Sequence, residues 1–168
     1  MKLSAPKYYK DFSCKADKCR HSCCVGWEID IDEKTLENYA SLPGEDGERI
    51  RKSISKDDGT PHFILTRGGA CPHLDENGLC RIITKYGDSM ISDICREHPR
   101  FYNLTKSGAE VGIGASCEEA ARLILSSDGY ADIEEIGETD AAKDSFDFDP
   151  LPERAVIFSI LGKRALSY

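Results

Sequence analysis

The sequence lacks the features that place a protein in or across a membrane. No apolar run approaches the roughly 18 residues of a membrane span. The first nine residues carry charge but no apolar core of a signal peptide. We therefore expect a cytoplasmic protein whose thiols stay reduced, which favours metal ligation over disulfides. The even number of cysteines would also suit a disulfide-stabilised exported domain.

The common catalytic fingerprints are missing as well. The chain has no P-loop, no G-x-S-x-G turn and no G-x-G-x-x-G after a candidate strand. Gly108, Gly112 and Gly114 precede a candidate helix, but their spacing does not fit a dinucleotide site. No basic face indicates a nucleic acid partner. The residues alone therefore identify no catalytic group.

The composition is that of a soluble globular protein, but its charge is unevenly distributed along the chain. Of the 168 residues, 40% are hydrophobic and 31% charged, which is enough for a core that needs no cysteine staples. The net charge is −8, and residues 132–153 alone supply it, with nine acids and one base. This stretch is either a solvated linker or a surface that attracts a lysine-bearing substrate.

Cysteine is what the chain has in excess. The eight cysteines are Cys14, Cys19, Cys23, Cys24, Cys71, Cys80, Cys95 and Cys117. A buried structural cysteine usually stands alone, whereas thiols clustered at short spacing indicate disulfides or a soft metal. We therefore predict all eight as candidate ligands of a metal or an iron–sulfur cluster.

The spacing of the cysteines leaves the kind of site open. The chain has no C-x2-C pair, the usual unit of structural zinc sites. Scattered ligands suit an iron–sulfur cluster at least as well as zinc. Cys23 and Cys24 are adjacent, so their side chains usually diverge and one of them can pack while the other ligates. His21, His73 and His98 each lie two or three residues from a cysteine and are either ligands or polar neighbours of the site.

The local patterns predict short helices and small strands. Asp32 is a candidate cap for a helix that continues to about residue 42. Residues 81–86 look helical and end at Gly87, and residues 101–104 and 110–113 can pair as strands. We expect an α+β fold, an irregular cysteine-rich domain organised around a metal or iron–sulfur site.

A capping box marks the start of another helix. In Ser116-Cys117-Glu118-Glu119 the serine side chain can bind the Glu119 amide while Glu119 reaches back. Cys117 would then lie in the first turn, where the helix dipole favours a thiolate.

The expected organisation has three parts. Residues 1–127 form the cysteine-cluster domain, residues 128–153 an acidic linker, and residues 154–168 an apolar helix. This helix either folds back on the cysteine domain or begins a region that this chain lacks.

Three stretches carry a family resemblance when taken together. Residues 12–27, 71–82 and 95–100 resemble the cysteine-cluster family of zinc- or iron-chelating proteins. Residues 116–122 narrow this to the N-terminal part of the flagellin lysine-N-methylase family, and the resemblance covers roughly residues 3–126. Members of that family are considerably longer.

The resemblance implies a bacterial enzyme that methylates the ε-amine of lysines on flagellin. S-adenosylmethionine would be the methyl donor, and the eight cysteines would hold an iron–sulfur cluster, 4Fe-4S in type, or zinc. Flagellin would be the partner, with no nucleic acid and no membrane. The alternative is a non-catalytic zinc- or iron–sulfur-binding module with a structural or redox role.

Overall fold

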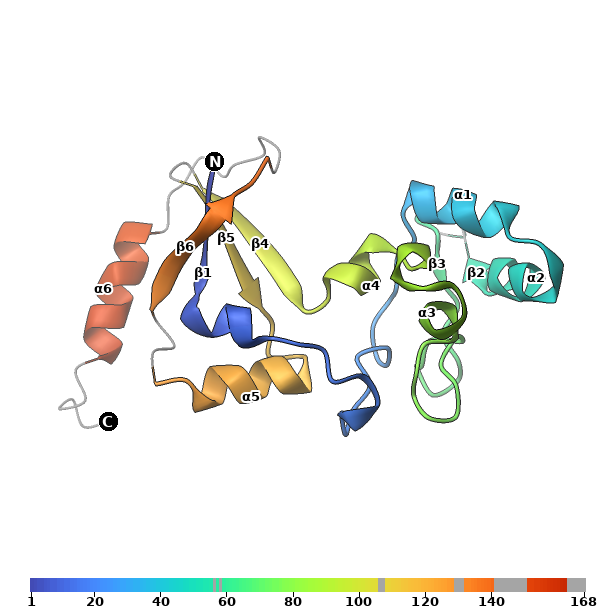
Figure 1. Cartoon of the computed structure of the whole chain (residues 1–168), viewed down its shortest axis with the longest axis horizontal. Helices are drawn as coiled ribbons and strands as arrows, with labels where there is room; N and C mark the ends of the chain where they lie inside the picture. Colours follow the sequence, from blue (N-terminus) through green and yellow to red (C-terminus); the bar gives the residue numbers. More distant parts are fainter. Residues whose placement is uncertain (56, 58, 106–107, 129–131, 141–150, 163–168) are drawn as a thin grey trace. The chain divides into compact units, whose positions relative to one another are not determined.

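The chain folds as two compact units, each of which contains helices and strands. The sheet unit comprises residues 1–13 and 99–168, and the cysteine unit comprises residues 14–98. The computed structural model describes residues 1–55, 57, 59–105, 108–128, 132–140 and 151–162. Short helices and small strands make up both units (Figure 1), which confirms the predicted α+β class.

The sheet unit is built on a four-stranded sheet in the order β4-β5-β1-β6. Its strands are β1 (Lys2–Pro6), β4 (Arg100–Thr105), β5 (Gly108–Ile113) and β6 (Ile133–Glu138). β4 and β5 pair antiparallel, with Phe101 opposite Gly112, which confirms the predicted pairing of these stretches. β1 pairs parallel with β5 and antiparallel with β6. The start of the chain therefore lies in the interior of the sheet.

Part of the acidic segment belongs to this sheet as β6. Three lysines of the N-terminal stretch pair with its acids: Lys2 with Glu135 at 2.8 Å, Lys7 with Asp132 at 2.8 Å and Lys10 with Glu134 at 3.3 Å. Residues 133–138 of the expected linker thus form a strand, because β1 offers a complementary edge. Residues 141–150 lie outside the described residues, and the boundaries at residues 127 and 153 stay predictions.

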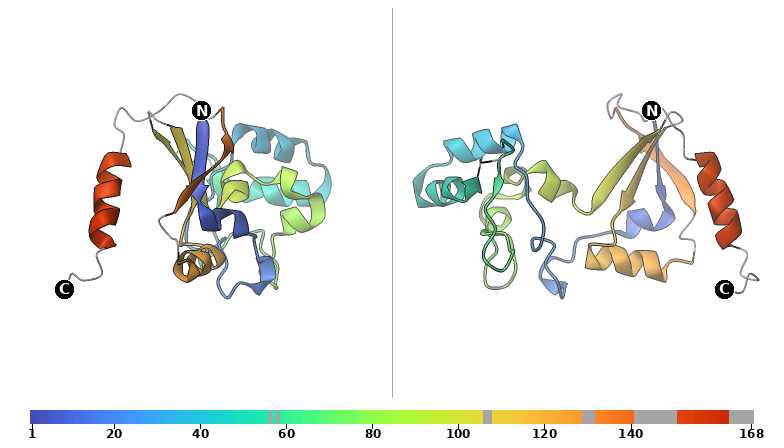
Figure 2. Two further views of the ribbon diagram at one scale, coloured as in Figure 1. Left: turned by 60° about the vertical axis from the view of Figure 1, so that its left-hand side comes forward. Right: turned by 180° about the vertical axis from the view of Figure 1, so that it is seen from behind.

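Helix α5 (Glu118–Ser126) contributes to the small apolar core of the sheet unit. Its residues Ala120 and Leu123 are buried with Ile113, against the 3₁₀ turn η1 (Lys7–Asp11). Figure 2 shows α5 beside η1 in both views. The aromatic side chains Tyr8, Tyr9 and Phe12 and the thiol of Cys117 pack on this small core.

The start of α5 differs from the predicted capping box by one residue. The helix begins at Glu118, so Cys117 and not Ser116 occupies the N-cap position, and the Cys117 side chain makes no capping hydrogen bond. The Glu119 carboxylate accepts two hydrogen bonds from Arg122, at 2.6 and 2.8 Å. This bidentate, charge-assisted pair is one of the stronger kinds of side-chain interaction.

Helix α6 (Leu151–Leu161) accounts for the described part of the predicted C-terminal helix. Arg154 forms a bidentate ion pair with Glu110 of β5. Four apolar side chains of α6 stay more than half exposed: Val156, Ile157, Ile160 and Leu161. Residues 163–168 lie outside the described residues, so the predicted end of this helix is not tested.

The cysteine unit consists of short elements around one apolar core. Its elements are η2 (Ala16–Lys18), α1 (Glu33–Ser41), α2 (Gly44–Lys52), β2 (Ile54–Ser55), β3 (His62–Phe63), α3 (Arg81–Tyr86), η3 (Asp88–Met90) and α4 (Asp93–Glu97). The buried core residues are Ile29, Ile31, Tyr39, Ile50, Phe63, Cys71, Ile82 and Ile91. Asp32 caps α1 through the Thr35 amide at 2.9 Å, as predicted. Gly87 ends α3 with a φ of 86°, a conformation that favours glycine.

Candidate metal centre

Two cysteine-bearing stretches of the cysteine unit lie side by side although they are far apart in the sequence. The Cys71 amide donates to the Cys24 carbonyl at 2.8 Å, and the Gly26 amide donates to the Gly69 carbonyl at 2.9 Å. Val25 and Ala70 form an isolated β-bridge between these contacts. The backbone therefore fixes the Cys23-Cys24 pair next to Cys71.

A tight turn brings Cys80 back towards the same region. Leu74 and Cys80 form a β-bridge, and the Asp75 carboxylate accepts the amides of Asn77 and Leu79, each at 2.8 Å. Gly78 has a φ of 76°, which only glycine adopts readily. Asn77 and Gly78 thus form a tight turn between the two cysteines, a conformation that this residue pair favours.

Cys95 is presented by α4, whose start is held by two neighbouring side chains. The Ser92 hydroxyl donates to the Cys95 sulfur at 3.5 Å. The Asp32 carboxylate, which caps α1, also accepts the Asp93 amide at 2.9 Å. One carboxylate therefore connects the first turns of two helices and sets the position of the helix that carries Cys95.

The thiols of these stretches lie close enough to influence each other electrostatically. Burial raises the pKa of Cys71 to about 11; the His73 amide, which donates to its sulfur, opposes this, while charges on Cys80 and Cys95 add to it. Burial also raises the pKa of Cys95, and the charges on Cys80 and Cys23 reinforce the shift. Several thiolates cannot coexist here without a compensating cation.

The adjacent pair behaves as one unit. The sulfurs of Cys23 and Cys24 lie 4.0 Å apart, and a hydrogen bond between them lowers the pKa of Cys23 and raises that of Cys24. Charges on Cys71 and Cys95 raise the pKa of Cys24 further. Five thiols thus form what we call the thiol cluster: Cys23, Cys24, Cys71, Cys80 and Cys95.

The other three predicted ligands differ in setting. Cys14 is exposed and Cys19 half-buried at the start of the cysteine unit, while Cys117 belongs to the sheet unit. Among the residues that the structure describes, no three cysteine, histidine or carboxylate side chains converge closely enough to hold a metal ion as they stand. The donor set nevertheless fits zinc or an iron centre, because soft thiolates that repel each other are the ligands such ions select.

Two buried polar atoms of the cysteine unit have no hydrogen-bond partner within the described chain: the Tyr39 hydroxyl and Nε2 of His98. The His98 ring stacks on Trp27 at 5.6 Å, and the Trp27 indole N–H donates to the Cys23 carbonyl. Burial lowers the pKa of His98, so its ring is neutral near pH 7 and its nitrogen can act as a ligand or an acceptor.

The other histidines have partners in the protein. Nε2 of His73 lies 2.9 Å from the Ser53 hydroxyl, which itself lies 2.7 Å from the Ile50 carbonyl. Because that hydroxyl donates to the carbonyl, His73 donates to the hydroxyl, and this nitrogen has no lone pair for a metal. Nδ1 of His62 bonds the Thr60 carbonyl at 2.9 Å. His21 also takes part in an interaction within the chain.

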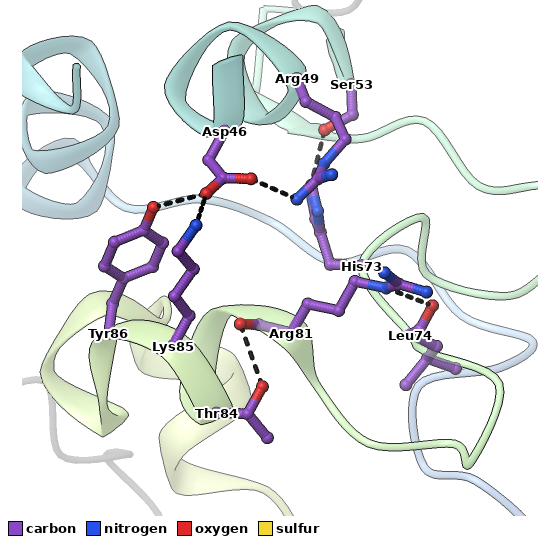
Figure 3. Close-up of polar contacts among 9 residues, drawn as sticks. All are labelled: Asp46, Arg49, Ser53, His73, Leu74, Arg81, Thr84, Lys85 and Tyr86. Atoms are coloured by element: carbon purple, nitrogen blue, oxygen red, sulfur yellow. Dashed lines mark hydrogen bonds and ion pairs between the residues drawn. The ribbon is translucent and has the colours of Figure 1, made fainter. Parts of the chain in front are cut away.

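A surface hollow of about 380 Å³ lies above His73, between α2 and α3. Asp46 accepts hydrogen bonds there from Arg49 at 2.7 Å, from the Tyr86 hydroxyl at 2.9 Å and from Lys85 (Figure 3). Burial, and then the charges of Arg49 and Arg81, lower the pKa of His73 to about 4. Three basic and three acidic residues line the hollow, so it selects no charge of one sign.

A family model matches residues 13–118, a stretch that contains all eight cysteines. Its description reads "Putative zinc- or iron-chelating domain". The chain belongs to this family of chelating domains. The family assignment inferred from the cysteine pattern is confirmed. The matched stretch contains the five cysteines of the thiol cluster and the three cysteines outside it.

Curated relatives of this zinc- or iron-chelating domain carry methylase and flagellar names. A lysine-N-methylase of Salmonella choleraesuis (strain SC-B67) and one of Salmonella typhimurium (strain LT2) are each 29% identical, in an alignment 137 residues long that covers 73% of this chain. The flagellar biosynthetic protein FliU of Salmonella muenchen is 28% identical over 133 residues, or 76% of its own length. The chain spans about a third of the length of the two methylases, 32% in each case. No solved structure matches the chain.

Sequence reasoning missed two residues of this region. Asp32 is predictable as a cap of α1, but its contact with α4 depends on tertiary packing. Tyr39 reads as an ordinary apolar-face residue of α1, and only the fold reveals that its hydroxyl is buried without a partner. None of the helices in the described parts of the chain has the length and apolar character to cross a lipid bilayer.

Proposed function

We propose that this chain is the cysteine-bearing part of a lysine N-methyltransferase that acts on flagellin with S-adenosylmethionine as methyl donor. The observation that carries the proposal is the gathering of five thiols from three separate stretches, in a chain related to lysine-N-methylases. The FliU relative supports a flagellar substrate. A cytoplasmic location follows from this reading, because free thiolate ligands need a reducing compartment.

The metal centre in this proposal is a 4Fe-4S cluster or a zinc ion. Cys23, Cys24, Cys71, Cys80 and Cys95 are the first candidates to hold it, because their thiols influence one another electrostatically and all but the exposed Cys23 lie in or against the apolar core. Cys14, Cys19 and Cys117 remain proposed ligands within the matched family region. When bound, the metal supplies the positive charge that allows the clustered thiols to ionise.

The protein residues around the centre hold the ligands in place. The His73 amide and the Ser92 hydroxyl donate to the sulfurs of Cys71 and Cys95, and both interactions favour the thiolate form. Trp27 stacks on His98, and its indole N–H donates to the Cys23 carbonyl. Contacts of this kind orient the ligands, which is the usual contribution of the shell around a metal site.

The acids of β6 are a weaker candidate for binding the lysines of a substrate. Asp132, Glu134 and Glu135 already pair with lysines of this chain's own N-terminal stretch. These pairs support the sheet, so β6 is better read as a structural strand than as a docking surface. Methyl transfer also requires a neutral lysine amine, which a desolvated site provides and a solvent-exposed acidic strand does not.

The metal is tested first. We expect anaerobically purified protein to contain iron with matching inorganic sulfide and a visible absorption band, or zinc without sulfide. A Cys71→Ser, Cys95→Ser double variant should lose the metal. Protein with eight free thiols and no metal would refute the proposed centre.

The methylase activity is tested separately. We expect S-adenosylmethionine-dependent methylation of purified flagellin by the longer enzyme, with flagellin whose surface lysines are replaced by arginine as the control. Binding of S-adenosylmethionine by this chain would place the donor site within it. If the loaded protein neither binds the donor nor supports methylation, the chain is a non-catalytic metal-binding module.

A further inference from the structure

Tyr39 is a buried residue with an unexplained hydroxyl. Its side chain is 1% exposed and lies on the inner face of α1. The ring packs against Phe63, with the ring centroids 6.0 Å apart. The hydroxyl has no hydrogen-bond partner among the described residues. A buried hydroxyl left without a partner destabilises the folded state, and native proteins contain few of them.

Three cysteines of the thiol cluster share the apolar core of Tyr39. Cys71 belongs to the same buried core as Tyr39, and Cys80 and Cys95 pack against that core. A phenol carries its proton near pH 7, so the Tyr39 hydroxyl can donate a hydrogen bond to an acceptor in this core.

We propose that the Tyr39 hydroxyl is a positioning group of the metal centre, which donates an O–H···S hydrogen bond to a ligand sulfur of Cys71, Cys80 or Cys95. The inference rests on the metal centre proposed above. A metal-bound thiolate is an anionic acceptor, whereas a protonated thiol is a weak one. The metal-loaded state thus supplies the partner that the hydroxyl lacks in the structure.

Tyr39→Phe removes only the hydroxyl, and its effect should depend on the metal. Without metal, the variant should be as stable as the wild type or slightly more stable, because the buried unpaired group is gone. With metal, the variant should bind Zn²⁺ about 10-fold more weakly, the loss typical of a hydrogen bond to a metal ligand. A merely structural role would lower the stability of both states alike.

A spectroscopic signature separates an effect on sulfur from an effect on packing. A hydrogen bond stabilises the lone pairs of the ligand sulfur, so its loss should move the thiolate-to-metal charge-transfer band to lower energy. Protein loaded with Co²⁺ gives this band for a mononuclear site. For protein reconstituted with iron and sulfide, the reduction potential of the cluster should become more negative in Tyr39→Phe.

Tyr86→Phe is the matched control. Tyr86 packs against the same core, but its hydroxyl donates to Asp46 at 2.9 Å, away from the sulfurs. This variant should lose some stability without metal and should leave the charge-transfer band and the Zn²⁺ affinity unchanged. The same loss of a hydroxyl is therefore expected to change the Zn²⁺ affinity and the charge-transfer band in Tyr39→Phe, and the stability of the metal-free protein in Tyr86→Phe.

The outcomes are distinct. If the wild type takes up neither Co²⁺ nor an iron–sulfur cluster, the proposed metal centre fails and this inference fails with it. If the wild type binds metal and Tyr39→Phe has the same affinity, band and potential, the inference alone is overturned. A Tyr39→Phe protein that is markedly less stable than the wild type in the metal-free state would also overturn it, because the hydroxyl would then have a partner in the protein.

Discussion

At the scale of single residues, Asp32 influences two helices at once. Its carboxylate accepts the Thr35 amide and hydroxyl of α1 and the Asp93 amide of α4, all at 2.9 Å. Burial alone would raise the pKa of Asp32, but these backbone and side-chain hydrogen bonds outweigh it and hold the pKa below its ordinary value. The folded state therefore favours the ionised carboxylate.

Asp32→Ala should destabilise the cysteine unit by about 1–3 kcal/mol, because a helix cap and a charge-assisted hydrogen bond are lost together. It should also weaken metal binding, since α4 carries Cys95. Urea unfolding and a Zn²⁺ titration measure the two effects. Glu33→Ala, at the neighbouring exposed position, should change neither by a comparable amount. Equal stability of the two variants would contradict the proposed role.

The contribution of Asp32 should depend on pH in a defined direction. A carboxyl whose pKa is lower in the folded than in the unfolded state stabilises the fold above the unfolded pKa of about 3.9. The stabilisation is lost as the pH falls from there through the folded pKa. The difference in free energy of unfolding between the wild type and Asp32→Asn should thus shrink on acidification. A difference that grows towards low pH would reverse the assignment.

At the scale of elements, Gly47 of α2 lies against Leu42, the residue that ends α1. Arg51 donates to the carbonyls of Tyr39 and Leu42 at 2.8 Å each and so completes the end of α1. A Cβ on Gly47 would overlap the Leu42 carbonyl oxygen. Glycine is thus needed here for close approach, although it is a poor helix former.

Gly47→Ala should destabilise the protein by about 1–3 kcal/mol, the usual cost of overpacking. The sign of the change in the free energy of unfolding is diagnostic, because glycine to alanine in an unobstructed helix stabilises the protein by up to about 1 kcal/mol. Thermal unfolding measures it, with Glu48→Ala on the exposed side of α2 as the control. A Gly47→Ala protein with a raised Tm would show that the two helices do not meet as described.

Elements with local signals were the ones that the sequence predicted well. Asp32 marks the start of α1 and Gly87 the end of α3. Both were predictable because a helix cap and a glycine with positive φ act within a few residues of the chain. The predicted cap at Ser116 lies one residue before the observed N-cap, Cys117, and the pair of Glu119 with Arg122 is a contact that the motif does not contain. The pairing of β1 with β5 and β6 was not predictable, since it joins stretches separated by most of the chain.

The candidate site was predictable in the same limited way. Eight cysteines indicated a metal or an iron–sulfur cluster. The cluster of five thiols depends on the contact between the Cys24 and Cys71 backbones, which spacing does not encode. The role of the Tyr39 hydroxyl depends on burial and is invisible to any pattern of residue types.

At the scale of the whole molecule, the two units have separate apolar cores. The core of the cysteine unit draws on residues 24–95, and that of the sheet unit on residues 8–12 and 113–123. Each core is enclosed by its own elements, so the two units can lose structure independently.

Metal removal should therefore unfold one unit and spare the other. Structural zinc contributes on the order of 10 kcal/mol to small domains, so chelation should melt the cysteine unit at a much lower temperature. The single tryptophan, Trp27, reports on this unit by fluorescence, while the far-ultraviolet signal of the sheet should persist. An unchanged fluorescence melting curve after chelation would contradict the structural role of the metal.

The order of the strands also matters while the chain is being made. β1 is translated before its partners β5 and β6, which follow the whole cysteine unit. At about 5–20 residues per second, β1 waits several seconds for these neighbours. The sheet can therefore close only after the cysteine unit has been synthesised. A shortage of the metal proposed for the thiol cluster would thus act on the nascent chain before the sheet is complete.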